Sequence, residues 1–522
     1  MKLYSILNDS LLWGPVARWA TTDAPWHQLW QTSMLGKASA VVSLASARLP
    51  LISLPGVSRL AQRLLMLGWA GLFALLTVCD TGIIGAVTLA LFALSLLLAL
   101  LGKHQSRDAE NKAMGSWVFT LPDALILGFV GVAVLATVGS TVQPQSAHGL
   151  LKLLTLVAGY AGMRMALAGS SVSQRVFWIT TIALLGLIQG GLGVLQSQQH
   201  VEALATWVDP DTLAEQSMTR VYGTLLPLNP NLYAGFLLPC LPAVALLAVW
   251  IASGVKGLGV MRQKPMLKIL MLLLGGASFG LSLLGIVLSG SRGGYLGLLG
   301  AGLTAFVISG LWVFRAQAPG ILRRLWLSAL GLVLGGLVLA LSLSAPLRVR
   351  VLSIGALWED SSIAYRLQVY QSVWRMIQEH WLLGIGPGNE TFRQLFGVYA
   401  PANLHALGAY SVPLEFWLEL GVFGLLLMLA LLSVLKCRTL CALEDPLSDL
   451  PDDTQTERLA ADAGQALSRL ILVAGWVAVV AMMAHGLFDT VFFRPSVQLM
   501  FWFWVALHVD ASCRLNCVSK KF

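Results

Sequence analysis

Long stretches without charge are the feature that most limits how this chain can fold. Three examples are "LLMLGWAGLFALLTV" (64–78), "GAVTLALFALSLLLALLG" (85–102) and "LVLGGLVLALSLSAPL" (332–347). Uncharged stretches near 18–20 residues are typical of membrane-spanning helices. Closed barrels also satisfy the backbone in lipid, but these stretches lack the alternation of barrel strands. With only 11% charged residues against about 25% in soluble domains, the sequence predicts an all-α polytopic membrane protein.

The pattern predicts about 12 transmembrane helices. We expect them to be centred near residues 70, 92, 130, 159, 186, 241, 278, 304, 336, 423, 479 and 504. With both termini in the cytoplasm, only nine of the 34 Lys and Arg residues fall in outer segments, as the positive-inside rule requires. The basic charge therefore reflects membrane topology, and no nucleic-acid partner is expected.

The membrane helices divide the chain into three parts. We expect a cytoplasmic N-terminal segment (1–60), a membrane domain (61–512) and a cytoplasmic tail (513–522). Within the membrane domain, residues 346–410 form a large extracytoplasmic loop. Residues 436–469 form a cytoplasmic loop with the acidic run "EDPLSDLPDDTQTE", which is typical of a solvated linker.

The large outer loop carries the densest polar chemistry. Apolar residues recur at helical spacing within 361–381, which predicts an amphipathic helix on the membrane surface or on the bundle. The stretch "GIGPGNETF" follows. A phosphate-binding loop is one interpretation, but Pro387 lacks the N–H such a loop uses, and nucleotides are scarce outside the cytoplasm. We therefore expect Gly384, Gly386 and Gly388 to form a structural turn after the helix.

Neither a metal nor a cofactor is expected. Cys437/Cys441 and Cys513/Cys517 are spaced i,i+4 on the cytoplasmic side. A metal or redox pair is one interpretation, but no His or further Cys completes a site, and reduced interfacial thiols are favoured.

Arginines on the outer face are candidate anion ligands. Arg292 and Arg366 would present forked donors to phosphate or carbonate oxygens. The alternatives are headgroup contact for Arg292 and pairing with Glu359 or Asp360 for Arg366. Arg393 is a weaker candidate of the same kind.

Two acid-containing pairs at i,i+4 spacing lie near the outer ends of predicted spans. Glu415 and Glu419 share one helix face and would carry protons or orient the arginines. His485 and Asp489 are typical either of a general base oriented by a carboxylate or of a structural polar clasp. No charged residue is expected near the middle of a span, which favours an outer-face site over a path through the membrane.

Several motifs resemble the O-antigen ligase and polymerase superfamily. They are "LNPNLYAGFLLPCLPA" (228–243), "SGSRGGYLGLL" (289–299), "YRLQVYQSVWRMIQEHWLLGIGPGNETF" (365–392), "AYSVPLEFWLELGVFGLLLML" (409–429) and "AHGLFDTVFFRPSVQLMFW" (484–502). The segment "GAYSVPLE" is most similar to the cyanobacterial IctB branch, whose members are described as bicarbonate transporters that support inorganic carbon accumulation.

The resemblance implies a helical bundle in a bacterial plasma (inner) membrane, with an outer-face cavity. Ligases of this superfamily move a glycan from a polyprenyl-pyrophosphate donor to an acceptor, without a nucleotide or an essential metal. Arginines hold the pyrophosphate, and a histidine after the large loop activates the acceptor. The matching positions are Arg292 of the "SRG" motif, the loop arginine Arg366, the turn Gly384, Gly386, Gly388 and Asn389, and the pair Glu419 and Gly421.

The family histidine is replaced in this chain. Counted back from Gly421, its position holds Tyr410, and His405 lies five residues away. Catalytic candidates are therefore Tyr410, His405, Glu419, His485 and Asp489. Two functions stay open: an IctB-like bicarbonate transporter, named first on resemblance, and an extracytoplasmic glycan ligase or polymerase acting on a lipid-linked donor. Both act at the lipid bilayer, and Tyr410 weakens the ligase whereas the uncharged midplane weakens the transporter.

Overall fold

The computed structural model is helical in every regular element that it describes. It describes residues 22–33, 55–102, 118–168, 170–199, 220–252, 265–315, single positions between 320 and 342, and 361–402, 404–443 and 455–515. The principal helices are α3 (Ala24–Thr32), α5 (Pro55–Leu75), α6 (Thr81–Gly102), α7 (Leu121–Val138), α8 (Gln143–Ala168), α9 (Val172–Gln198), α10 (Pro230–Leu237), α11 (Cys240–Ala252), α13 (Pro265–Leu288), α14 (Arg292–Arg315), α17 (Ser361–His380), α18 (Asn389–Tyr399), α19 (Val412–Ala442), α20 (Gln455–His485) and α21 (Pro495–Arg514).

Nine helices in the described part of the chain are long and apolar enough to cross a membrane. They are Thr81–Ala99, Leu121–Val138, Gln143–Ala168, Val172–Gln198, Pro230–Ala252, Pro265–Leu288, Arg292–Phe314, Val412–Ala442 and Ala463–His485. The span expected near residue 70 is a shorter apolar helix, Leu60–Leu75, and the one near 504 is α21. The span expected near 336 falls where the description is incomplete. The chain is a polytopic helical membrane protein, and the count of twelve remains a prediction.

Helix α21 forms the centre of the bundle. Its residues from Ser496 to Ser512 are all buried, and it packs against α8, α19 and α20. Aromatic side chains from distant helices meet there: the ring of Phe503 lies 5.0 Å from that of Phe73 and 6.2 Å from that of Trp178. Because neighbouring helices surround α21, its polar residues need partners inside the protein rather than in lipid.

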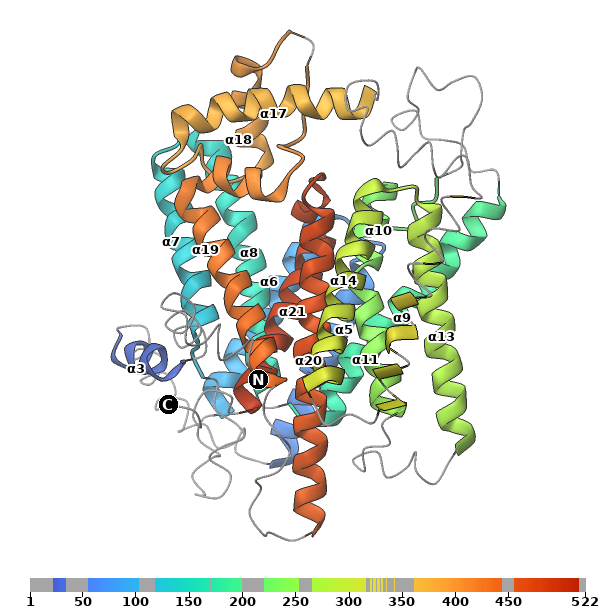
Figure 1. Ribbon diagram of the computed structural model, residues 1–522. Coiled ribbons are helices and arrows are strands. Elements are labelled where there is room, and N and C mark those ends of the chain that lie inside the picture. Colours follow the sequence, from blue (N-terminus) through green and yellow to red (C-terminus); the bar gives the residue numbers. More distant parts are fainter. Residues whose placement is uncertain are drawn as a thin grey trace.

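At the end of the bundle near α3 (Figure 1), a buried network of charged groups provides hydrogen-bond partners for a polar residue of α21. Asp23 precedes α3, and its Oδ1 accepts hydrogen bonds from the Leu121 N–H at 2.9 Å and from Arg438 Nη2 at 2.5 Å. Arg438 also donates to Ser512 Oγ at 2.8 Å. One carboxylate therefore joins α3 to α7 and α19, and Arg438 extends the connection to α21.

A second carboxylate lies beside this network. Asp123 accepts hydrogen bonds from Thr120 Oγ1 at 2.6 Å and Tyr160 Oη at 2.7 Å, and it pairs with Arg164 at 3.4 Å. Buried ions are costly unless they are paired and hydrogen-bonded. Both Asp123 and Arg164 meet that condition, although the sequence alone gives little sign of it.

Removing the charge of Asp23 should destabilise the fold without touching the opposite end. Asp23→Asn keeps an acceptor oxygen but loses the ionic bond to Arg438, and hydrogen bonds to charged groups contribute about 1.5–3 kcal/mol. We expect a lower melting temperature of the purified protein in detergent. Glu390→Gln is the control, because Glu390 pairs with Lys152 at an exposed position, where such pairs contribute about 0–1 kcal/mol. Equal melting temperatures for Asp23→Asn and the wild type would contradict this role.

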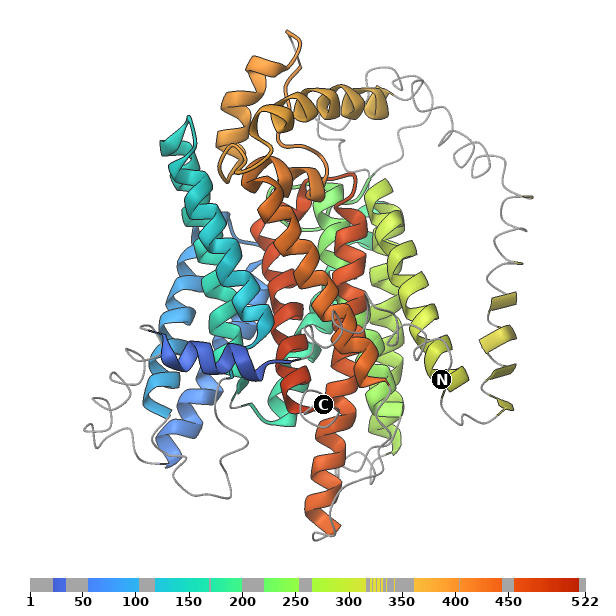
Figure 2. The same cartoon turned by 60° about the vertical axis from the view of Figure 1, so that its left-hand side comes forward.

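The opposite end of the bundle carries a cap made of residues 361–411. Figure 2 shows α17 lying across the upright helices, with α18 beside it. One face of α17 is buried, including Val369, Val373 and Ile377, and it packs with Phe392 of α18 and Leu418 of α19 in a separate hydrophobic cluster. Trp374 and Trp381 are exposed. The amphipathic helix expected from the sequence thus packs on the bundle.

Candidate functional site

The glycine turn after α17 docks into a break in α19. At Gly421 the backbone has a φ of 66°, which interrupts the helix. The turn then supplies hydrogen bonds that the helix cannot make: the Ile385 N–H donates to the Leu418 carbonyl at 2.8 Å, and the Gly386 N–H donates to the Glu419 carbonyl at 3.0 Å. In return, the Val422 N–H donates to the Trp381 carbonyl at 2.9 Å. The turn and the broken helix therefore form one junction.

Close backbone approach explains why this junction uses glycine. A Cβ on Gly421 would lie 2.0 Å from the Leu382 carbonyl oxygen, and one on Gly384 would lie 2.5 Å from the backbone of Glu419. On α8, a Cβ on Gly149 would lie 1.9 Å from the Pro387 carbonyl oxygen. Gly384, Gly386 and Gly388 also have positive φ values, which glycine adopts at little cost. Backbone packing, rather than phosphate binding, accounts for the spacing of "GIGPG".

The two buried glutamates of α19 hold the cap segments. Glu415 is 0% exposed, and its Oε2 accepts a hydrogen bond from the Ala409 N–H at 2.5 Å. Glu419 is 7% exposed, and its backbone carbonyl accepts the hydrogen bond from the Gly386 N–H. Neither carboxylate forms an ion pair with a described residue. The expectation that they orient the arginines is therefore replaced by contacts with the backbone of the cap.

A polar cluster forms where the cap meets the end of α20. Arg366 Nη2 on α17 lies 4.0 Å from Asp489 Oδ2. That oxygen also accepts a hydrogen bond from Asn231 Nδ2 at 2.8 Å, and Asp489 Oδ1 accepts one from the Val491 N–H at 3.0 Å. Arg366 donates no hydrogen bond to another described residue. Its guanidinium is held near a carboxylate but is not bonded to it.

Arg220 extends this cluster toward Arg292. Arg220 Nη2 donates to Asn231 Oδ1 at 2.9 Å, and its Nε donates to the Ser289 carbonyl at 2.8 Å. Ser289 lies in the turn between α13 and α14, and Arg292 is the first residue of α14. Arginines from three separate segments therefore converge on the cap end of the bundle.

Tyr410 lies beside Arg366 in a strained conformation. Its φ of 49° is unusual for a residue other than glycine. The guanidinium of Arg366 lies 5.9 Å from the centre of its ring, a cation–π distance. Its carbonyl accepts a hydrogen bond from Tyr370 Oη at 3.0 Å, and the Tyr365 ring lies 5.8 Å away. Burial, and then the Tyr365 hydroxyl, raise the pKa of the Tyr410 phenol above its ordinary value.

His485 is near this cluster but is enclosed by the bundle. Its side chain is 2% exposed, and Nε2 has no hydrogen-bond partner among the described residues. The ring packs between two helices at glycines, since a Cβ on Gly293 would lie 2.3 Å from it and one on Gly235 would lie 3.1 Å from it. No hydrogen bond between His485 and Asp489 is seen.

The other candidates from the sequence lie in the cap. His405 is exposed, and its carbonyl accepts a hydrogen bond from the Tyr365 hydroxyl. Asn389 donates to the Leu407 carbonyl at 3.0 Å, which places it in the cap framework. Arg393 is exposed on α18. Glu359 and Asp360, the expected partners of Arg366, lie outside the described residues.

Sequence reasoning missed Arg220 and Asn231 as site residues. The motif "LNPNLY" indicates where α10 begins, because an Asn before proline, here Asn229, is typical of a helix N-terminus. Asn229 does cap α10, accepting hydrogen bonds from the N–H groups of Asn231 and Leu232. Arg220 lies in an irregular segment, and no pattern marks it.

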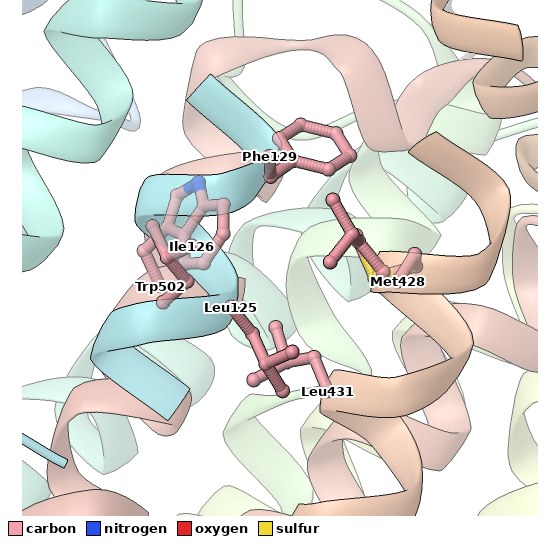
Figure 3. Close-up of a pocket in the computed structure, with 7 residues that line it drawn as sticks. Leu125, Ile126, Phe129, Met428, Leu431 and Trp502 are labelled. Carbon is pink, nitrogen blue, oxygen red and sulfur yellow. The ribbon is translucent and has the colours of Figure 1, made fainter. Parts of the chain in front are cut away.

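A cavity farther down the bundle is unsuited to a polar substrate. It measures about 10 Å³ and lies among Leu125, Phe129, Met428, Leu431 and Trp502 (Figure 3). Its lining is almost wholly apolar, and its size is that of one water molecule at most. Among the described residues, no group of three or more His, Cys, Asp or Glu side chains is arranged to hold a metal ion.

One family model matches part of the chain. Residues 277–429 match the family described as O-Antigen ligase, and no curated protein matches. The matched segment runs from α13 into α19 and includes Arg292, Arg366, Tyr410 and Gly421. Its description agrees with the superfamily resemblance of the motifs and does not separate the IctB branch from the rest. The described helices are those of a polytopic membrane protein, and its segment 277–429 is similar to the O-Antigen ligase family.

Proposed function

We propose that this chain transfers a glycan from a polyprenyl-pyrophosphate donor to an acceptor at the outer face of the bacterial plasma membrane. The observation that carries the proposal is the cluster of Arg366, Tyr410 and Asp489 at the cap end. Two of these residues lie inside the segment that matches the O-antigen ligase family, and the third closes the cluster from the loop after α20.

The arginines suit a phosphate-bearing ligand. Arg366 is 4.0 Å from Asp489, beyond hydrogen-bonding distance, so its forked donors are available for ligand oxygens. Arg292 begins α14, where the helix dipole favours negative charge. Two forked cations on separate helices fit a pyrophosphate better than they fit a single small anion.

A lipid chain has apolar surface beside this site. In the most apolar part of each helix, only 22% of the described residues of α13 and 28% of those of α14 are buried. Leu299 and Leu303 of α14 are each 56% exposed. We propose that a polyprenyl tail lies along these helices while its pyrophosphate reaches Arg292.

In the proposed reaction, the acceptor hydroxyl oxygen attacks the anomeric carbon of the donor glycan. The bond between that carbon and the phosphate oxygen breaks, and its electron pair remains on the lipid pyrophosphate. The hydroxyl proton passes to water. Arg292 and Arg366 stabilise the charge that develops on the leaving group, which is the usual role of fixed cations in such transfers.

Bicarbonate transport, the first interpretation of the sequence resemblance, finds no support in the comparisons. The matched description is that of an O-antigen ligase. The comparisons do not support the IctB branch either. We therefore propose glycan transfer ahead of bicarbonate transport.

A transfer assay tests this function. The full chain in lipid nanodiscs is given an undecaprenyl-pyrophosphate-linked oligosaccharide and acceptor sugars, and released undecaprenyl pyrophosphate is measured. We expect acceptor-dependent release. Uptake of labelled bicarbonate into proteoliposomes without any glycan transfer would overturn the proposal.

The proposal requires the cap to face outward. A cysteine introduced at Asn389 should react in intact cells with a membrane-impermeant thiol reagent, because α18 lies in the predicted outer loop. Labelling is measured before and after lysis, with the native cysteines replaced by alanine. Protection of this position until the cells are lysed would reverse the orientation.

Tyr410 should position a ligand rather than take a proton. Its raised pKa means that the phenol stays protonated at and well above neutral pH, so it is a poor base. Tyr410→Phe keeps the ring beside Arg366 and deletes only the hydroxyl, and one neutral hydrogen bond contributes about 0.5–1.5 kcal/mol. We expect a loss of about tenfold or less in kcat for glycan transfer.

Losing a general base reduces a rate by about 10²–10⁴-fold. A loss of about a thousandfold in Tyr410→Phe, with normal expression and melting temperature, would restore Tyr410 to the role of the family histidine. Tyr399→Phe is the matched control, because that tyrosine bonds to Glu379 on the cap surface.

A further inference from the structure

A chain of polar contacts joins two arginines that are distant in the sequence. It runs from Arg366 through Asp489 and Asn231 to Arg220, and then to the Ser289 carbonyl. We propose that Arg220 is a third cation of the donor site, and that Asn231 and Asp489 are positioning residues that fix its separation from Arg366. This inference rests on the proposed glycan-transfer function.

Asn231 connects the two ends of this chain. Its Nδ2 donates to Asp489 Oδ2 at 2.8 Å, and its Oδ1 accepts from Arg220 Nη2 at 2.9 Å. An amide side chain can donate to a carboxylate through its nitrogen and accept from a guanidinium through its oxygen at the same time. The Asn229 side chain fixes the first turn of α10 through the Asn231 N–H at 2.7 Å. The orientation of Asn231 is therefore set from both sides.

Asp489 is held as firmly at the other end. It is 5% exposed, and its Oδ1 is occupied by the Val491 N–H at 3.0 Å. Its Oδ2 is bonded to Asn231 and faces Arg366 at 4.0 Å. A ligand oxygen or a water molecule can therefore bridge Arg366 and the rest of the cluster without displacing Asp489.

Arg220 contacts the turn that leads into Arg292. Its Nε donates to the Ser289 carbonyl at 2.8 Å, and a Cβ on Gly290 would lie 3.4 Å from that same Nε. Gly290 has a φ of 63°, and the turn that it makes leads directly into Arg292. Arg220 therefore lies on one side of the Asn231–Asp489 pair and Arg366 on the other, and the turn that Arg220 contacts leads into Arg292.

This arrangement predicts selectivity between lipid phosphates. Arginines on two sides of a fixed polar pair match a ligand with two phosphate groups, whereas one phosphate group reaches only one side. The full chain should therefore prefer a lipid pyrophosphate, and Arg220 should contribute to that preference more than to general affinity. A purely structural role for Arg220 would lower binding of both lipids equally.

Binding of two probes tests this inference. Undecaprenyl pyrophosphate and undecaprenyl monophosphate are titrated into the full chain in nanodiscs. We expect Arg220→Gln to weaken pyrophosphate binding about 10- to 100-fold, the range for a lost hydrogen bond to a charged group, and to change monophosphate binding by about threefold or less. Arg375→Gln is the matched control, because Arg375 is exposed elsewhere on the cap.

The roles of Asn231 and Asp489 are tested by the same ratio of pyrophosphate affinity to monophosphate affinity. Asn231→Ala and Asp489→Asn should each lower the ratio of pyrophosphate to monophosphate affinity, and the double variant should lose less than the two single losses combined, since both act through one chain of contacts. If Arg220→Gln does not fold, the same ratio of affinities is measured on Arg220→Lys. It keeps the charge but loses the fork, so the ratio should still fall.

The outcomes separate the two proposals. A wild-type chain that binds neither probe, or both equally, overturns this inference; binding neither also overturns the proposed function. A wild-type chain that prefers the pyrophosphate while every Arg220 variant keeps the same ratio overturns only the role of Arg220. If Arg375→Gln lowers the ratio of pyrophosphate to monophosphate affinity as much as Arg220→Gln does, the specific role of the cluster is overturned.

Discussion

Replacing Arg366 with glutamine is expected to lower kcat/KM for glycan transfer by about 10²–10⁴-fold. Its side chain is 20% exposed, lies 4.0 Å from Asp489 and forms no hydrogen bond with a described residue, so its donors are available for the leaving pyrophosphate. Each hydrogen bond to a charged group contributes about 1.5–3 kcal/mol, and losing two of them gives a change of this size. The transfer assay in nanodiscs, at saturating acceptor, measures it.

A matched change isolates this effect from net charge. Arg494 caps α21 through its backbone and lies outside the chain of contacts that links Asp489 to Arg220. Arg494→Ala should keep most of the activity, and Arg292→Ala should lose it as Arg366→Gln does. Equal tolerance of the changes at Arg292, Arg366 and Arg494 would count against an anion site shared by the first two.

The membrane character of the fold could be predicted because it depends on composition over short stretches. An uncharged stretch of about 20 residues is stable in lipid only as a helix, whatever the rest of the chain does. Helix α21 shows where this reasoning stops. A span centred near residue 504 was predicted from the sequence, but the burial of this helix inside the bundle was not, because burial depends on which helices surround it. The same limit applies to the pair of Asp23 and Arg438, which are far apart in the sequence.

Individual members of the candidate site could be named from the sequence, but their arrangement could not. Arg366 and Asp489 were recognised by residue type and neighbouring motifs. Their proximity depends on how the cap docks on α19 and on where the loop after α20 ends, and both are tertiary features. Arg220 carries no local pattern, so only the folded arrangement shows it beside Ser289.

The glycines of the cap illustrate the difference between a pattern and its cause. "GIGPG" predicted a turn after α17, which the positive φ values of Gly384, Gly386 and Gly388 match. The reason for Gly421 was hidden, because an isolated glycine is common in membrane helices. Its role appears only when the Leu382 carbonyl is seen against it. The "GIGPG" turn and the isolated Gly421 are therefore two sides of one contact, the junction between the cap and α19.

The largest loss of stability should come from adding one methyl group at this contact. In Gly421→Ala the new Cβ would lie 2.0 Å from the Leu382 carbonyl oxygen, at a residue whose φ is 66°. With a ψ of −172°, the backbone of Gly421 lies in a region that is essentially restricted to glycine and costs another residue about 1–3 kcal/mol, and overpacking costs about 1–3 kcal/mol more. Separating the surfaces instead would break the bonds that Ile385 and Val422 make across the junction. We expect a free energy of unfolding lower by about 3–5 kcal/mol, measured by denaturant unfolding in detergent micelles.

The partner position and a neutral position complete the test. Gly149→Ala should have a similar effect, because its Cβ would lie 1.9 Å from the Pro387 carbonyl oxygen on the other side of the turn. Gly276→Ala should leave stability nearly unchanged or raise it slightly, since nothing lies within 4 Å of its Cβ and alanine favours a helix by about 1 kcal/mol over glycine. If Gly421→Ala is as stable as Gly276→Ala, the turn does not dock in the break of α19. The arginine of α17 would then lack the support that holds it near Asp489, and the site would need another origin.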